Sequence, residues 1–242
     1  MFDFDGVLVD GMAEYWWSAR RAALSLLPQL TLPEVAPAGF SRLRPCIHKG
    51  WEMVLMAAEL GRADFDLEAS CAAYPRALQL ALGRWQLTPE RLQDALEVVR
   101  RQAIAADLPA WLALHRFYPG VPERLRRLRQ EGGDWSVLTT KGGSFASQLL
   151  AAADLRPRAV HGHEQGSKPE VLERLLRIDP ELWFIEDRRP TLEQVRETPG
   201  LESVRCYLVS WGYLAPGDGE RLPPGIRNLD PETFQRPLAH WP

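Results

Sequence analysis

Seven residues with reactive side chains follow the short apolar runs of the sequence or open the helix after one: Asp3, Asp5, Thr139, Thr140, Lys168, Glu186 and Asp187. If those runs are strands of one parallel sheet, the side chains meet at the edge of the sheet where such folds bind ligands. Four carboxylates, two hydroxyls and one ammonium suit phosphoryl transfer to an aspartate. A carboxylate can attack phosphorus, Mg²⁺ held by carboxylates can screen the repulsion, and Lys and Thr can hold the phosphoryl charge.

Strands that could carry these residues are predicted mainly in the second half of the chain. Short apolar runs at 135–138, 159–160, 182–185 and 204–209 alternate there with segments of helical periodicity. The helices are expected from Pro122, over 144–153, from Pro169 and after Pro190. Strands that alternate with helices in this way are typical of a parallel, doubly wound sheet. One more short strand is expected at the start of the chain, before Asp3.

The segment between that first strand and the alternating part is predicted to be helical. Helices are expected over 12–27, 49–60 and 66–82, and another begins at Thr88-Pro89. Thr is a favoured N-cap, and Pro is tolerated in the first helical turn. The segment 30–44 contains Pro33, Pro37 and Gly39 and is expected to be a loop. The chain is therefore predicted to be an α/β core with a helical insertion of roughly a hundred residues.

Composition excludes several classes of function. The 242 residues carry a formal net charge of −3, which argues against a dedicated nucleic-acid binder. No stretch approaches the ~20 apolar residues of a membrane span, and no basic segment followed by an apolar run precedes the first strand. The three cysteines are scattered without metal-ligand spacing. We expect a cytoplasmic protein, monomer or homodimer, with no nucleic-acid and no membrane partner.

Four short segments, in this order, resemble the motifs of the haloacid dehalogenase-like (HAD) superfamily. They are Phe2-Asp3-Phe4-Asp5-Gly6-Val7-Leu8-Val9-Asp10, Val137-Leu138-Thr139-Thr140-Lys141, Gly166-Ser167-Lys168-Pro169 and Phe184-Ile185-Glu186-Asp187. The resemblance implies a Rossmann-like parallel sheet core with an all-helical cap inserted after the first strand, as in phosphoglycolate phosphatases and beta-phosphoglucomutases. The core domain would comprise 1–11 and 116–242, and the α-helical cap domain 12–115.

The resemblance also implies a role for each motif residue. Asp3 is expected to be the nucleophile and a Mg²⁺ ligand, and Asp5 the general acid and base whose backbone carbonyl also contacts the metal. The transferring phosphoryl group is expected to be bound by Thr139 and Lys168, with Thr140 beside them. Asp187 is expected to hold Mg²⁺, with Glu186 as the second acid. Because Asp5 can protonate a leaving alkoxide and later activate water, phosphate-ester chemistry is favoured over dehalogenation.

Two further features of the sequence are a basic segment in the helical insertion and the short stretch before Asp3. The basic segment around Arg44 in the helical insertion is either a solvated loop or a part that grips an anionic leaving group, in which case Arg44 is the expected contact. Only Met1 and Phe2 precede Asp3, whereas relatives of the superfamily usually carry several apolar residues there. Either the first strand is very short or the chain begins further upstream.

The motifs predict a Mg²⁺-dependent phosphatase that hydrolyses a small phosphorylated metabolite through an aspartyl-phosphate at Asp3. A phosphomutase, which returns the phosphoryl group to substrate, carries the same motifs. A relative that keeps the fold only to bind a ligand is the third hypothesis. Retention of both the nucleophile and the acid speaks against it, because binding alone does not need the pair.

Overall fold

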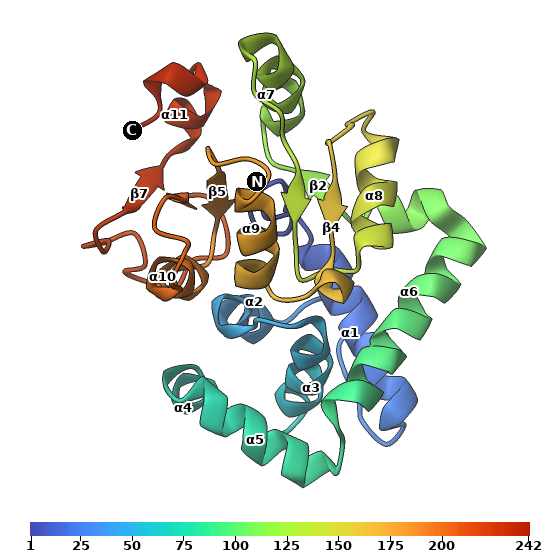
Figure 1. The fold of residues 1–242 in the computed structure, drawn as a ribbon. Helices are drawn as coiled ribbons and strands as arrows, with labels where there is room; N and C mark the ends of the chain where they lie inside the picture. Colours follow the sequence, from blue (N-terminus) through green and yellow to red (C-terminus); the bar gives the residue numbers. More distant parts are fainter. The chain divides into compact units, whose positions relative to one another are not determined.

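The computed structural model describes residues 1–242 and contains a parallel sheet at the centre of the core (Figure 1). Its strands are β3 (Val137–Leu138), β4 (Val160–His161), β5 (Trp183–Glu186), β6 (Arg205–Val209) and β7 (Ile226–Leu229). β4 pairs with β3, and β5, β6 and β7 pair in that order, all in parallel. The α/β fold class predicted from the alternation is confirmed.

The first three residues join the two halves of this sheet. Phe2 bridges Val137 on one side and Ile185 on the other, both in parallel. Its amide donates to the Ser136 carbonyl at 2.9 Å, and the Asp3 amide donates to the Ile185 carbonyl at 2.8 Å. The central strand of the sheet therefore ends at Asp3.

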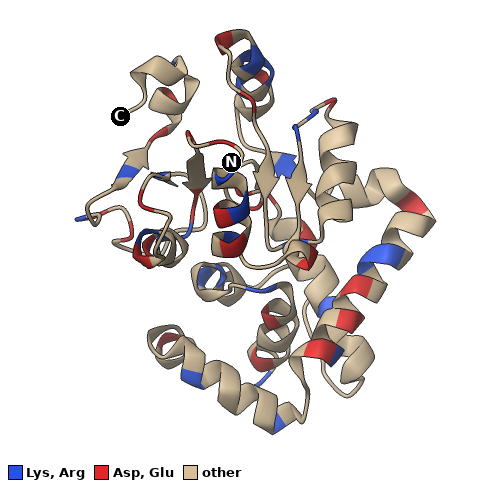
Figure 2. Cartoon of the chain, in the orientation of Figure 1, with Lys and Arg blue, Asp and Glu red and all other residues tan.

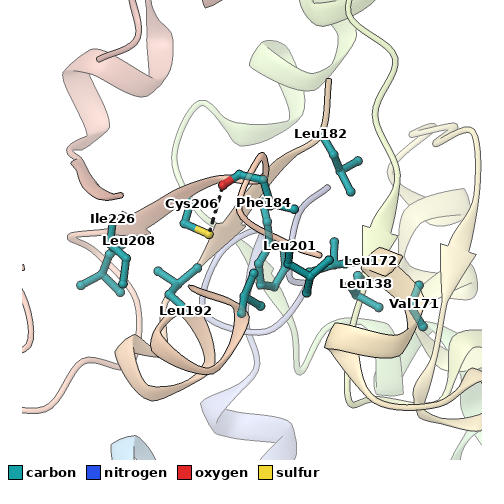
Figure 3. Packing of buried hydrophobic residues seen from close by; sticks show 12 residues of the cluster. Leu138, Val171, Leu172, Leu182, Phe184, Leu192, Leu201, Cys206, Leu208 and Ile226 are labelled. Carbon is teal, nitrogen blue, oxygen red and sulfur yellow. Dashed lines mark hydrogen bonds between the residues drawn. The ribbon is translucent and has the colours of Figure 1, made fainter. Parts of the chain in front are cut away.

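Four helices of the core connect successive strands, and a fifth follows the last strand. They are α7 (Val121–Leu128), α8 (Gly143–Ala152), α9 (Lys168–Leu176), α10 (Arg189–Glu197) and α11 (Pro231–Gln235). α9 begins with a capping box in which Ser167 and Glu170 each accept from the other's backbone amide. Leucines of α9 and α10 pack with Phe184 and Leu208 of the strands, as Figure 3 shows. This packing fixes the helix starts beside the strand ends.

Residues Gly11–His115 form a second compact unit that consists of helices. These are α1 (Met12–Leu26), α2 (Ala38–Leu43), α3 (Gly50–Leu60), α4 (Leu67–Ala72), α5 (Tyr74–Trp85) and α6 (Pro89–Leu112). The core unit comprises Met1–Asp10 and Arg116–Pro242, so the first crossing lies one residue earlier than we expected. Acidic and basic residues both occur along α6 (Figure 2), which gives that helix charge of mixed sign. No helix combines the length and the hydropathy that crossing a bilayer requires.

A buried ion pair lies inside the helical unit. Arg100 donates from Nε and Nη2 to the two carboxylate oxygens of Glu14 at 2.7 and 2.8 Å. Glu14 is fully buried and Arg100 is 4% exposed. The bidentate geometry offsets part of the cost of removing both charges from water.

Several local predictions were wrong. The segment 30–44 is not a loop throughout, because α2 and a 3₁₀-helix over Arg44–Cys46 form in it. The helix expected over 66–82 is two helices. Pro75, in the first turn of α5, has no backbone N–H to continue the helix from α4. The sheet does not end at β6, because β7 and α11 follow.

A two-stranded antiparallel ribbon was also missed. β1 (Val9–Asp10) pairs with β2 (Arg116–Phe117), with Asp10 opposite Arg116. These strands are the two places where the chain leaves the core for the helical unit and returns. With two residues each, they are too short to show the alternation by which a strand is recognised in a sequence.

Candidate active site

Lys168 lies between two buried carboxylates at the carboxyl end of the sheet. Its ammonium Nζ is 2.9 Å from Asp3 Oδ1 and 2.6 Å from Glu186 Oε2. Asp3 follows the central strand, Glu186 is the last residue of β5, and Lys168 is the first residue of α9. All three side chains are at most 10% exposed. The strand ends and the start of α9 thus bring one cation and two acids together with little exposure to solvent.

Asp187 completes a group of three acids. Carboxylate oxygens of Asp3, Glu186 and Asp187 lie within 4.8 Å of one another. Carboxylate oxygens are the ligands that Mg²⁺ prefers, usually one or two from protein with the rest from water and phosphate. Three such groups at one strand edge therefore fit a hard divalent cation.

Glu186 is also engaged in its own turn. Its Oε1 accepts from the backbone amides of Asp187 and Arg188 at 3.1 and 3.2 Å. These bonds, together with Lys168 on Oε2, hold the carboxylate in one orientation. Glu186 can therefore fix Lys168 as well as offer an oxygen to a metal ion.

The crowding of acids perturbs their protonation. Burial, and next the Glu186 carboxylate, raise the pKa of Asp3 from 3.8 to about 7, although Lys168 opposes the shift. Burial likewise raises the pKa of Glu186. For Lys168 burial acts to lower the pKa, but the Asp3 and Glu186 carboxylates outweigh it and raise the pKa above its usual value. Burial and mutual repulsion thus disfavour the ionised forms of these acids, and a divalent cation bound among them would favour ionisation.

Asp5 has its own cation. Lys141 Nζ lies 3.3 Å from Asp5 Oδ1, and the Lys141 side chain is 2% exposed. The backbone amide of Lys141 donates to Thr139 Oγ1 at 3.0 Å, so the buried Thr139 side chain also shapes this turn. Thr140 follows in the same turn and is half-buried.

The predicted residues thus fall into two groups. The core unit carries seven of them, around the carboxyl ends of its strands, and direct contacts link Asp3, Glu186 and Lys168. Arg44 belongs to the helical unit. There its guanidinium carbon lies 5.1 Å from the ring centre of Tyr15, and Nη1 donates to the Ile47 carbonyl at 3.2 Å.

Two residues that the sequence reasoning did not assign to the site also contact it. Lys141 was visible as a lysine two positions after Thr139 in a chain whose basic residues are almost all arginine. Tyr213 donates its backbone amide to Asp187 Oδ2 at 2.7 Å. A hydrogen bond donated by a backbone amide leaves no pattern in the sequence, because every residue except proline has such an amide.

Comparison with known proteins supports the fold. No protein-family model matches the chain. A phosphoglycolate phosphatase from Pseudomonas putida is 26% identical over 153 residues, which are 62% of this chain and 44% of that protein. The match therefore spans less than half the length of this curated relative.

Several solved structures match nearly the whole chain, and two of them serve as examples. A predicted phosphatase from Clostridium acetobutylicum superposes with a TM-score of 0.63 at 14% identity, over 97% of this chain and 94% of that one. A haloacid dehalogenase-like family hydrolase from Streptococcus pneumoniae gives 0.60 at 17% identity, over 98% and 93%. The resemblance seen in the motifs is thereby confirmed at the level of the fold: the chain has the haloacid dehalogenase-like fold.

Proposed function

We propose that this chain is a Mg²⁺-dependent phosphatase that hydrolyses a small phosphorylated metabolite through an aspartyl-phosphate on Asp3. The observation that carries the proposal is the contact of Lys168 with Asp3 at 2.9 Å, beside the acids Glu186 and Asp187. The contact supports the proposal because the reaction needs a nucleophile, a cation for the phosphoryl charge and metal-binding oxygens close together. The relatives named as phosphatases and hydrolases support the same reaction class.

The first chemical step is attack by an Asp3 carboxylate oxygen on phosphorus. The bond to the ester oxygen breaks, and Asp5 gives its proton to the departing alkoxide. Lys168 holds the ionised form of Asp3 and the charge on the phosphoryl oxygens, with Thr139 as a further donor. Bound Mg²⁺, held by Asp3, Asp187 and Glu186 and the Asp5 carbonyl, would supply charge neutralisation between nucleophile and phosphate.

The second step returns the enzyme to its starting state. Asp5, now ionised, takes a proton from a water molecule that attacks the acyl phosphate. The bond between phosphorus and the Asp3 oxygen breaks, which releases inorganic phosphate and the free carboxylate. Lys141 Nζ, 3.3 Å from Asp5 Oδ1, helps to hold the Asp5 side chain in place for both proton transfers.

Phosphate release from p-nitrophenyl phosphate tests the proposal. The purified protein is expected to release phosphate with Mg²⁺, and Asp3→Asn is expected to abolish the reaction. Asp134→Asn is the matched control, because its side chain is 61% exposed and paired only with the exposed Arg158. Activity that survives Asp3→Asn, or that EDTA leaves unchanged, would contradict the mechanism.

A panel of phosphate esters then identifies the substrate class. The name of the curated relative makes phosphoglycolate the first ester to try. If Arg44 recognises an anionic leaving group, Arg44→Met raises KM for phosphoglycolate more than for an uncharged alkyl phosphate. An equal effect on both esters would contradict that role for Arg44.

A phosphomutase remains the alternative within the same chemistry. It would retain the phosphoryl group on Asp3 until a second substrate hydroxyl accepts it. Turnover that requires a sugar bisphosphate, with little release of inorganic phosphate, would favour the mutase. Binding of Mg²⁺ and phosphate without turnover of any ester would favour a non-catalytic protein.

A further inference from the structure

Tyr213 contacts two acids with two different groups. Its backbone amide donates to Asp187 Oδ2 at 2.7 Å, and its phenolic hydroxyl donates to Asp10 Oδ1 at 3.0 Å. Tyr213 follows β6 in the loop that begins at Ser210. One residue therefore links an acid of the proposed metal site to a residue of the β1–β2 ribbon.

Asp187 fits closely between two glycines of different segments. A Cβ added to Gly6 would lie 1.9 Å from Asp187 Oδ2, and one added to Gly212 would lie 2.3 Å from the Asp187 Cβ. Gly6 also has a φ of +91°, which side chains rarely adopt. With no room on either side, the position of this carboxylate depends on where the loops of Gly6 and Gly212 lie.

Those two loops are tied together at two points. Trp211 Nε1 donates to the Val7 carbonyl at 3.1 Å, and the Tyr213 hydroxyl reaches Asp10. Asp10 is the last residue of the core unit before the helical unit, and it pairs with Arg116 where the chain returns. The hydroxyl of Tyr213 thus connects the ribbon through which the chain crosses between units to the loop that holds Asp187.

We propose that Tyr213 is a positioning residue that couples the β1–β2 ribbon to Asp187, and that its bond to Asp10 sets the metal affinity of the site. The proposal rests on the proposed function, because it takes Asp187 as a metal ligand. Partners that orient a ligand in this way typically change metal affinity or activity by about 10- to 100-fold when removed. Loss of the hydroxyl alone leaves the amide on Asp187, so we expect the lower end, about tenfold.

The test measures Mn²⁺ binding by electron paramagnetic resonance in the absence of any phosphate ester. Tyr213→Phe removes only the hydroxyl, and Asp10→Ala removes its acceptor. Tyr207→Phe is the matched control, since Tyr207 lies in β6 and its hydroxyl donates to the carbonyl oxygen of Pro242 at 2.8 Å, away from the acids. Tyr213→Phe and Asp10→Ala are each expected to weaken Mn²⁺ binding about tenfold, while Tyr207→Phe binds like the parent protein.

The double variant separates coupling from general loosening. If the two side chains act through their shared bond, Tyr213→Phe with Asp10→Ala binds Mn²⁺ as weakly as either single variant, not about 100-fold weaker. Parent-like binding by Tyr213→Phe, or additive losses in the double variant, would overturn the coupling and leave the proposed phosphatase intact. A parent protein that neither binds Mn²⁺ nor releases phosphate would overturn both. Should Tyr213→Phe fail to fold, the comparison of Asp10→Ala with Arg116→Ala decides, because Asp10 Oδ2 also accepts from Arg116 at 3.3 Å.

Discussion

Asp3→Asn is expected to abolish catalysis and at the same time to stabilise the metal-free protein at alkaline pH. Burial and the neighbouring Glu186 raise the pKa of Asp3 from 3.8 to about 7. The native protein therefore keeps this proton over a pH range in which the unfolded chain has already released it. Unfolding then releases a proton, so the free energy of unfolding falls as the pH rises from about 4 to about 7.

The size of the change in the free energy of unfolding follows from the shift in the pKa of Asp3. When the native state binds one more proton than the unfolded state, the free energy of unfolding changes by about 1.4 kcal/mol per pH unit. Over the range from 3.8 to about 7 the penalty for ionised Asp3 reaches about 4 kcal/mol, of which about 3 kcal/mol accumulates above pH 5. Asparagine cannot ionise, so the variant lacks this penalty. The gain is an upper value, because Lys168 loses one of its two carboxylate partners.

Urea unfolding with EDTA at pH 5 and pH 8 measures the difference. The stability of Asp3→Asn relative to the parent is expected to increase by up to about 3 kcal/mol between the two pH values. Asp134→Asn, the exposed control, should follow the parent at both. Saturating Mg²⁺ at pH 8 should stabilise the parent more than the variant, by about 2.7 kcal/mol at 100 times the dissociation constant. Parallel pH profiles for parent and Asp3→Asn would refute the assignment of a raised pKa to Asp3.

Three further outcomes follow from buried charges. Lys168→Met is expected to lower kcat for phosphate release by at least about 100-fold, because the phosphoryl charge loses its cation; a smaller loss would contradict that role. Lys141→Met is expected to lower kcat by up to about 100-fold through displacement of Asp5, with Mn²⁺ binding retained, and parent-like kinetics would argue against it. Glu14→Ala is expected to lower the free energy of unfolding by about 3–5 kcal/mol because the buried Arg100 loses its bidentate contact with the Glu14 carboxylate. Urea unfolding checks it, and replacing both residues by leucine should recover much of the loss.

The sequence predicted the core of the site because strand ends determine it. Asp3, Glu186 and Asp187 could be placed together from apolar runs and the rule for parallel sheets alone. The backbone of Phe2 is paired on both sides, which places Asp3 beside the end of β5. The boundaries of the predicted core elements moved by one or two residues, which did not change the site.

What the sequence could not predict depends on close approach between distant segments. The fit of Asp187 between Gly6 and Gly212 arises only when β5 lies between the central strand and β6. The bond from Tyr213 to Asp10 joins residues 203 positions apart. β7 and α11 were missed because they follow a turn-rich segment and have only four and five residues. Elements this short do not show a hydrophobic period.

Each of the two buried arginines binds one carboxylate through two nitrogens of its planar guanidinium group. Arg100 binds Glu14 through two nitrogens, and Arg124 binds Glu131 through two more while its Nε donates to the Phe234 carbonyl. Five fixed donors need several acceptors in one plane, and these positions supply them. Such pairs hold helices and loops in place, but their hydrogen bonds fix the guanidinium in one orientation.

The two buried lysines are found instead at the two acids of the first motif. Lys168 contacts Asp3, and Lys141 contacts Asp5, whereas Lys49 is exposed. An ammonium is a compact charge on a flexible stem, so it can lie between acids and still turn toward a phosphoryl oxygen that arrives later. In a chain with 26 arginines and three lysines, this difference explains why lysine persists at these two positions. It also predicts that Lys168→Arg will not restore the activity lost in Lys168→Met, although the charge is kept.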